Sequence, residues 1–175
     1  MAAIIVLCVM AVVCVGIWGV VAHNTIVNQK NLVAESWRMI DVELLRRYDL
    51  IPNLVRVVEA FAQHERRMLE LLTEARVSAM AKRALPERAE AEADLGQVVD
   101  TVLMRAESYP TLQSNRQFLV LQRELTATEN RIAAARRIYN GNVRALNSSL
   151  QSFPSSIVGS LMGAKPAQYF ELTGR

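Results

Sequence analysis

The stretch "FLVLQRELTATENRIAAARRIYNGNVRALNSSLQSF", residues 118–153, decides the fold class of this chain. Its apolar side chains return in alternating steps of three and four residues, the spacing of one stripe along an α-helix rather than the alternation of a strand. The series is Phe118, Leu121, Leu125, Thr128, Ile132, Ala135, Tyr139, Val143, Leu146, Leu150 and Phe153. Residues 118–153 are therefore predicted to form a long helix that packs nearly parallel or antiparallel to others.

Three more series of this kind precede it. They are Val33, Trp37, Ile40, Leu44 and Tyr48; then Leu54, Val58, Phe61, Met68, Leu72, Ala75 and Ala79; then Ala91, Leu95, Val98, Val102, Ala106 and Tyr109. Pro52, Pro86 and Pro110 stand where new series begin, and Pro154 stands where the last one ends. Short connections make neighbouring helices antiparallel, so the chain is predicted to be all-α, with a long, coiled-coil-like antiparallel four-helix bundle.

The stretch "RRYDLIPNLV", residues 46–55, is predicted to be the turn between the first two helices. Asp49 would cap the second helix and Pro52 would occupy its first turn. Arg46 and Arg47 would lie in the last turn of the first helix, beside its negative end. Tyr48 closes the first apolar series.

The N-terminal stretch from Ala2 to Ala22 contains no charged residue. As a helix it spans about 31 Å, the thickness of the hydrocarbon core of a bilayer. It is longer than the apolar region of a cleaved signal peptide and lacks the charged start of one, so a retained transmembrane helix is the preferred interpretation and a signal peptide the alternative. Gly16, Gly19 and Ala22 recur every three residues, which favours association with another helix in the membrane.

The flanking charges predict the orientation of this helix. Lys30, Arg38, Arg46 and Arg47 follow it and no Lys or Arg precedes it, which places the N-terminus outside and the bundle in the cytoplasm. The expected location is therefore a membrane, crossed once by this helix. The predicted parts are an anchor at 1–23, a helical bundle at 24–153 and a hydrophobic tail at 154–175.

The sequence contains no recognisable catalytic motif. Its two histidines, His23 and His64, are far apart in the chain, and a zinc site needs three or four ligands. No cofactor or metal is expected, and a net charge of +3 without a basic run argues against nucleic acid as a partner. The protein is predicted not to be an enzyme.

Several polar or aromatic residues border the predicted seams and are candidates for binding a partner or fixing the register of the helices. In the first part of the bundle they are Trp37, Asp41, Arg46, Arg47, Tyr48 and Asp49, and on the last helix they are Glu129, Asn130, Arg136, Tyr139 and Asn140. One interpretation is that their side chains pair across the bundle. The other is a polar groove for a peptide or a lipid headgroup.

The chain also resembles the LemA family of bacterial proteins, from about residue 23 to 171. The resemblance is carried by "SWRMIDVELLRRYDLIPNLV" (36–55), "HE" (64–65), "LTATENRIAAARRIYN" (125–140), "FP" (153–154) and "YFE" (169–171). It implies an N-terminal membrane anchor and a largely cytoplasmic antiparallel helical bundle, and it implies no enzymatic activity. Members of the family are linked to bacterial membrane organisation, including magnetosome membranes. The resemblance thus implies a location in the bacterial inner membrane or in an organelle membrane derived from it.

An even number of antiparallel helices returns the C-terminal tail to the bilayer. The tail is expected either to lie on the lipid surface or to fold back over the end of the bundle. Its candidate lipid-contacting residues are Ile157, Val158, Leu161, Met162, Tyr169 and Phe170.

The favoured function is a membrane-anchored scaffold or adaptor that contacts the lipid bilayer, other membrane or cytoplasmic proteins, and further copies of itself. The alternative is a lipid- or peptide-binding module with a groove between its helices.

Overall fold

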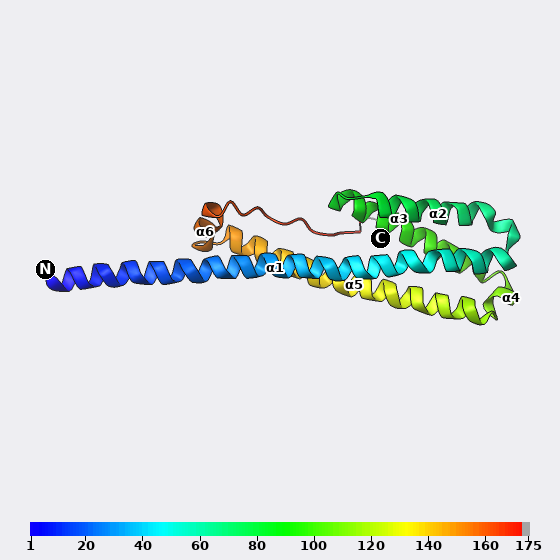
Figure 1. The fold of residues 1–175 in the computed structure, drawn as a ribbon, viewed down its shortest axis with the longest axis horizontal. Coiled ribbons are helices and arrows are strands. Elements are labelled where there is room, and N and C mark those ends of the chain that lie inside the picture. The colour runs from blue at the N-terminus through cyan, green and yellow to red at the C-terminus, as the bar shows by residue number, and fades with distance from the viewer. Residues whose placement is uncertain (173–175) are drawn as a thin grey trace. The chain divides into compact units, whose positions relative to one another are not determined.

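The structure is a computed structural model that describes residues 1–172, and every regular element in that range is helical. The elements are α1 (Ala2–Phe61), the short 3-10 helix η1 (Gln63–Glu65), α2 (Arg66–Ala81), α3 (Leu85–Ala106), α4 (Pro110–Gln113), α5 (Arg116–Gln151) and α6 (Ser155–Leu161). Figure 1 shows them along the chain. The predicted all-α fold class is confirmed.

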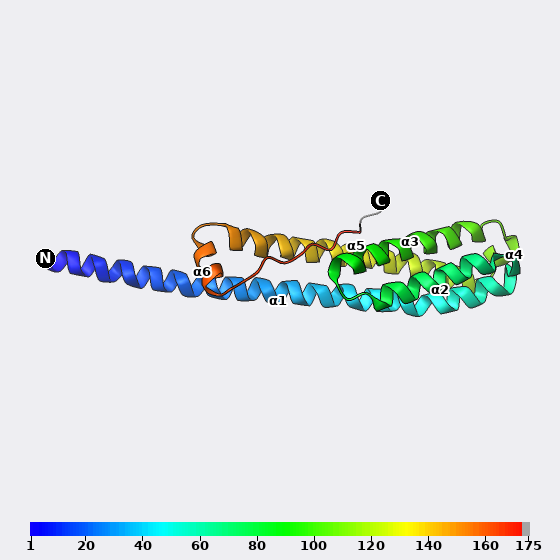
Figure 2. The same cartoon turned by 90° about the horizontal axis from the view of Figure 1, so that it is seen from above.

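The contacts divide the chain into two units. Unit 1 contains residues 1–37 and 138–169, and unit 2 contains residues 38–137 and 170–172. Unit 1 therefore comprises the first part of α1, the last part of α5, α6 and an extended segment after it. Unit 2 comprises the rest of α1 and α5 with α2, α3 and α4, and α2 and α3 lie side by side in it (Figures 1 and 2). The predicted division of the chain into an anchor (1–23), a helical bundle (24–153) and a hydrophobic tail (154–175) stays a prediction.

The predicted turn at residues 46–55 is wrong, because α1 continues without a break through Pro52 to Phe61. A proline inside a helix costs about 3 kcal/mol. Ile51, Leu54 and Val58 are almost fully buried on the same stripe, and each such side chain contributes about 1.5–3 kcal/mol. Burial outweighs the proline, so Asp49 caps no helix and Arg46 and Arg47 lie in mid-helix.

The reversal of the chain comes about ten residues later, between Phe61 and Arg66. The second predicted series of apolar residues gave no sign of this turn. Its members Phe61 and Met68 lie on either side of the turn and are seven residues apart, which is a helical spacing. In the structure Glu65 Oε1 accepts hydrogen bonds from Arg105 Nε (3.1 Å) and the Tyr109 hydroxyl (2.9 Å). These contacts with Arg105 in the last turn of α3 and with Tyr109, just before α4, hold the turn, and the local sequence does not show them.

Other boundaries agree better with the proline pattern. Pro86 lies in the first turn of α3, and Pro110 begins the short α4 rather than the long helix. Helix α5 begins at Arg116, where Asn115 Oδ1 accepts hydrogen bonds from the backbone N–H groups of Gln117 (2.9 Å) and Phe118 (3.0 Å). From Phe118 to Leu146 every member of the predicted fourth series is buried, whereas Leu150 is half-buried and Phe153 is exposed.

Helix α1 also carries the most apolar part of the chain. Its most apolar 18-residue stretch has a mean hydropathy of 3.0, and none of that stretch is buried by protein. Among the described residues, α1 is the one helix long and apolar enough to cross a membrane. These properties are compatible with a single-pass anchor, and they are shared with N-terminal signal sequences.

Candidate functional site

Unit 2 contains a buried ionic cluster centred on Glu92 of α3. The Glu92 carboxylate accepts hydrogen bonds from the Arg47 guanidinium and the Tyr48 hydroxyl, both on α1. A second nitrogen of Arg47 donates to Glu129 of α5, at 2.9 Å. The side chains of Arg47 and Glu92 are only 3% and 1% exposed. We call Arg47, Tyr48, Glu92 and Glu129 the Glu92 cluster.

Two further ion pairs connect the same helices. Asp41 of α1 lies 2.7 Å from a guanidinium nitrogen of Arg88 on α3. Glu43 of α1 lies 3.8 Å from Arg131 on α5. Together with the Glu92 cluster, these contacts fix α1 to α3 and α5 through charged groups that must all be matched.

Sequence reasoning missed Glu92, although a signal for it existed. Glu92 is one of the buried residues of α3, which are Ala89, Ala91, Glu92, Leu95, Val99, Val102 and Ala106. The predicted series ran through Ala91, which is indeed buried, but it left Glu92 among the acidic residues of an ordinary helix start. A carboxylate at a seam position needs a buried partner, and the chemistry of Arg47 and Tyr48 supplies two.

The other candidate residues of unit 2 have more exposed positions. Arg46 and Asp49 are exposed on α1, and Asn130 is exposed on α5. Arg136 is half-buried and lines a hollow of about 160 Å³ between α3 and α5, together with Glu92, Glu129 and Leu172. The structure thus joins Asp41, Arg47, Tyr48 and Glu129 to contacts between helices and leaves Arg46, Asp49 and Asn130 exposed.

The remaining candidates lie in unit 1. The rings of Trp37 and Tyr139 pack edge to face, with centroids 5.4 Å apart. The Tyr139 hydroxyl donates to the carbonyl oxygen of Gln168 at 2.9 Å. Asn147 of α5 donates to the carbonyl oxygen of Ala167 (2.9 Å) and accepts from its N–H (2.8 Å). The extended segment 164–169 is therefore held along α5. Asn140, the remaining candidate on α5, is half-buried.

The tail residues divide into exposed and buried groups. Ile157 and Leu161 of α6 and Tyr169 are exposed, and Val158 and Met162 are half-buried. Phe170 is fully buried, so the prediction that it contacts lipid is wrong for this residue. The reason is that the Phe170 side chain is wholly apolar and is buried, whereas Tyr169, which carries a polar hydroxyl, stays 40% exposed.

The surroundings of Tyr48, Tyr109 and Tyr139 raise the pKa of each of these hydroxyls. Burial, reinforced by the hydrogen bond to Glu92, raises the pKa of Tyr48 well above its ordinary value of 10.0. The hydrogen bond to Glu65 raises the pKa of Tyr109, and burial raises the pKa of Tyr139. In the Glu92 cluster the carboxylate is neutralised by Arg47 and shielded from solvent, an arrangement suited to fixing helices.

Stability should therefore fall as the pH rises above about 10, because unfolded Tyr48 then loses its proton while folded Tyr48 keeps it. The contribution of Tyr48 is fully present below that pH and is lost as the pH passes through the folded pKa. Urea unfolding at several pH values from about 8 to 11 measures the slope. Tyr48→Phe should flatten the decline, and Tyr169→Phe, at an exposed ring, is the control. A decline as steep in Tyr48→Phe as in the unchanged protein would contradict the assignment.

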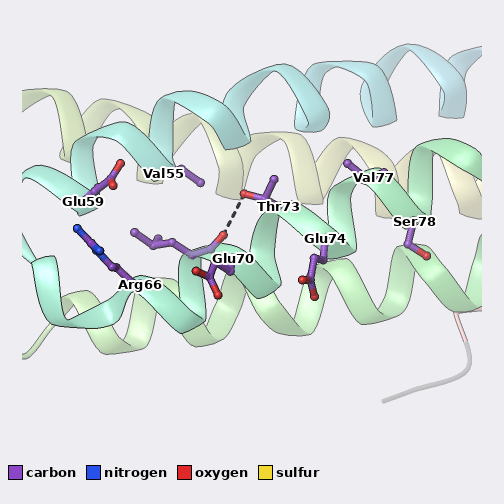
Figure 3. A pocket seen from close by; sticks show the side chains of 9 residues that line it. Val55, Glu59, Arg66, Glu70, Thr73, Glu74, Val77 and Ser78 are labelled. Atoms are coloured by element: carbon purple, nitrogen blue, oxygen red, sulfur yellow. Dashed lines mark hydrogen bonds between the residues drawn. The ribbon is translucent and has the colours of Figure 1, made fainter.

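A groove between α1 and α2 is the largest hollow described in unit 2. It has a volume of about 790 Å³ and is lined by Val55, Glu59, Arg66, Leu69, Glu70, Thr73, Glu74, Val77 and Ser78. Figure 3 shows Glu59 and Arg66 at one end, Glu70 and Thr73 in the middle, and Glu74, Val77 and Ser78 toward the other end. We call it the α1–α2 groove. Its apolar side chains come from both helices, and its glutamates outnumber its single arginine.

A second hollow, of about 570 Å³, lies between the last turns of α1 and the start of α5. Its charged residues are Arg56 and Arg116, and its apolar lining includes Phe61 and Val120. The charged side chains of this hollow are thus positive, whereas most of those in the α1–α2 groove are negative. Among the described residues, no three His, Cys, Asp or Glu side chains lie together in a way that could hold a metal ion.

These features define an all-helical protein with one long apolar N-terminal helix and with matched charges buried between the helices of unit 2. Residues 36–175, which make up most of the chain, match the LemA family. The protein belongs to the LemA family. A comparison with curated proteins finds no match.

Proposed function

We propose that this protein is a single-pass bacterial membrane protein whose helices form an antiparallel four-helix bundle that acts as a non-catalytic scaffold for other proteins. The charge-free exposed stretch of α1 supports the anchor. Lys30 and Arg38, on the C-terminal side of that stretch, support a cytoplasmic bundle. The Glu92 cluster supports a structural role, since its charged groups are occupied by one another.

The α1–α2 groove is the observation that carries the proposal. Val55, Leu69 and Val77 give it an apolar surface, and Glu59, Glu70 and Glu74 give it negative charge. A groove between two helices suits an amphipathic helix, whose apolar residues enter the groove while its polar face stays in water. The occupant that fits best is an amphipathic helix of a partner protein with Lys or Arg beside its apolar face.

The alternative function is a lipid- or peptide-binding module, and its lipid-binding form is less well matched to this groove. The carboxylates of Glu59, Glu70 and Glu74 repel the anionic headgroups of bacterial lipids. They attract a basic peptide by the same interaction. The charge of the groove therefore favours protein over lipid as the ligand.

A photoreactive amino acid at Val77 should crosslink a distinct protein in native membranes. Val77 lines the α1–α2 groove and is 57% exposed. The matched control is the same amino acid at Met104 of α3, which is 63% exposed and lies outside the groove. Adding Glu70→Gln and Glu74→Gln should lower the yield at Val77 about fivefold, since two exposed charge pairs together contribute about 1 kcal/mol.

Three outcomes would count against the proposal. Equal crosslinking at Val77 and Met104 would mean that the groove has no special role. An unchanged yield after the glutamate substitutions would remove the basic partner helix. Crosslinking of Val77 to lipid alone would favour the lipid-binding alternative.

A further inference from the structure

Helix α6 lies next to the end of the apolar stretch of α1. A β-carbon added to Gly159 of α6 would lie 2.7 Å from Leu150 of α5 and 3.9 Å from Ile26 of α1, so α6 packs closely on both helices (Figure 2). Ile26 is fully buried and follows Ala22, the last residue of the charge-free stretch, by four residues. At 1.5 Å per residue, α6 contacts α1 about 6 Å beyond the end of that stretch.

The face of α6 that is not packed on protein carries two large apolar side chains beside Ser160. Leu161 is 84% exposed and Ile157 is 52% exposed, and their spacing of four residues places them on the same side of the helix. Phe153, just before α6, is 82% exposed. Three large apolar side chains so exposed in one short segment form a patch of the kind that marks a binding surface.

The chain reverses its direction just after α6, so the apolar patch lies at a bend of the chain. Gly163 has a φ of +60° and follows the last turn of the helix. Its N–H bonds to the carbonyl of Ser160, and the N–H of Ala164 bonds to the carbonyl of Gly159, each at 3.0 Å. This pair of bonds is the Schellman arrangement that ends a helix. The following residues then run along α5, held by Asn147, so α6 forms the outside of the bend.

The charges of unit 1 suit an anionic surface. Its basic side chains are Lys30, Arg144 and Lys165, and Lys165 and Arg144 are exposed. Glu35 is its only carboxylate side chain, and residues 138–169 contain no Asp or Glu. Anionic lipids of the cytoplasmic leaflet attract Lys and Arg near the membrane surface and repel carboxylates.

We propose that α6 is a second membrane contact, which lies flat on the cytoplasmic lipid surface beside the transmembrane part of α1. Phe153, Ile157 and Leu161 enter the boundary between headgroups and acyl chains, and Lys165 stays among the headgroups. A rigid helix fixed at two points cannot tilt freely, so this contact sets the direction in which α1 leaves the membrane. The inference rests on the proposed membrane anchor and adds a second, separate attachment to it.

The test uses the full chain in vesicles of phosphatidylethanolamine and phosphatidylglycerol. Cys8 and Cys14 are replaced by alanine, and one cysteine carrying an environment-sensitive fluorophore is introduced at Leu161, at Val13 or at Val77. Val13 lies within the charge-free stretch and reports on the anchor, whereas Val77 is an exposed apolar residue of unit 2. Nitroxide-labelled lipids then quench any fluorophore that contacts the bilayer.

Quenching at Leu161 and Val13 but not at Val77 is the expected result. Quenching at Val13 with no quenching at Leu161 would overturn the second contact and leave the anchor intact. Absence of quenching at Val13 would overturn the anchor itself, and the inference with it. As a second measurement, Ile157→Ser should lower the quenching at Leu161 without changing that at Val13, since only α6 would leave the surface. Unchanged quenching at Leu161 would mean that Ile157 does not hold α6 there.

Discussion

Replacing Glu92 by alanine should lower the free energy of unfolding by about 3–5 kcal/mol. Stability is lost because Arg47 stays charged after its buried partner Glu92 is removed, at a site where the Arg47 side chain is only 3% exposed. Glu129 alone would then face that guanidinium, and its own side chain is 36% exposed, so water screens the remaining pair. The Tyr48 hydroxyl would lose its acceptor as well. Urea unfolding of the full chain in detergent micelles, followed by circular dichroism, gives the difference.

The matched control is Arg46→Ala, one residue from the cluster. Arg46 is exposed and lies 4.0 Å from Glu43, a geometry that contributes less than about 1 kcal/mol. If Glu92→Ala and Arg46→Ala lowered stability equally, the Glu92 cluster would have no special role in the fold.

A triple variant separates the contribution of the Glu92 cluster to stability from its role in pairing α1 with α3. Changing Arg47, Tyr48 and Glu92 together to Met, Phe and Leu removes all the buried charge at this point and should restore most of the stability lost in Glu92→Ala. The same variant would lose the directional contacts that pair α1 with α3 at one register. A stable triple variant that still crosslinks normally from Val77 would limit the cluster to a role in stability alone.

The parts of this fold that follow local rules could be predicted from the sequence. The stripe of α5 from Phe118 to Leu146 is periodic and buried, and Pro86 marks the start of α3 as its chemistry requires. Pro52 shows the limit of such rules. A local signal for a break was overruled by the burial of Ile51, Leu54 and Val58, which depends on helices that come later in the chain.

The candidate site was less predictable, because its partners are distant in sequence. Asp41, Arg47 and Tyr48 could be chosen as polar or aromatic residues near a seam, but their partners Arg88 and Glu92 lie more than forty residues away. Likewise, nothing in the sequence near Tyr139 and Asn147 indicates that their side chains form hydrogen bonds with the backbone of Gln168 and Ala167. A pattern within one helix shows which face is buried and leaves open what covers it.

Replacing Phe170 by alanine should lower the free energy of unfolding by about 3–5 kcal/mol, the cost of deleting a fully buried phenylalanine side chain. This effect is large for a residue so near the C-terminus, where chain ends usually contribute little. The control is Tyr169→Ala, since Tyr169 is the neighbouring aromatic residue and is 40% exposed, so its loss should cost clearly less.

Hydrogen exchange gives a second measurement on the same variants. The N–H of Ala167 bonds to Asn147 Oδ1, so it should exchange slowly in the unchanged protein. Without the Phe170 ring, the extended segment 164–169 loses its attachment at one end and this N–H should exchange faster, whereas Tyr169→Ala should leave the rate nearly unchanged. If Phe170→Ala and Tyr169→Ala behaved alike in both measurements, the end of the chain would not be anchored by Phe170. Asn147 and Tyr139 would then hold the segment alone, through one backbone N–H and two carbonyl groups.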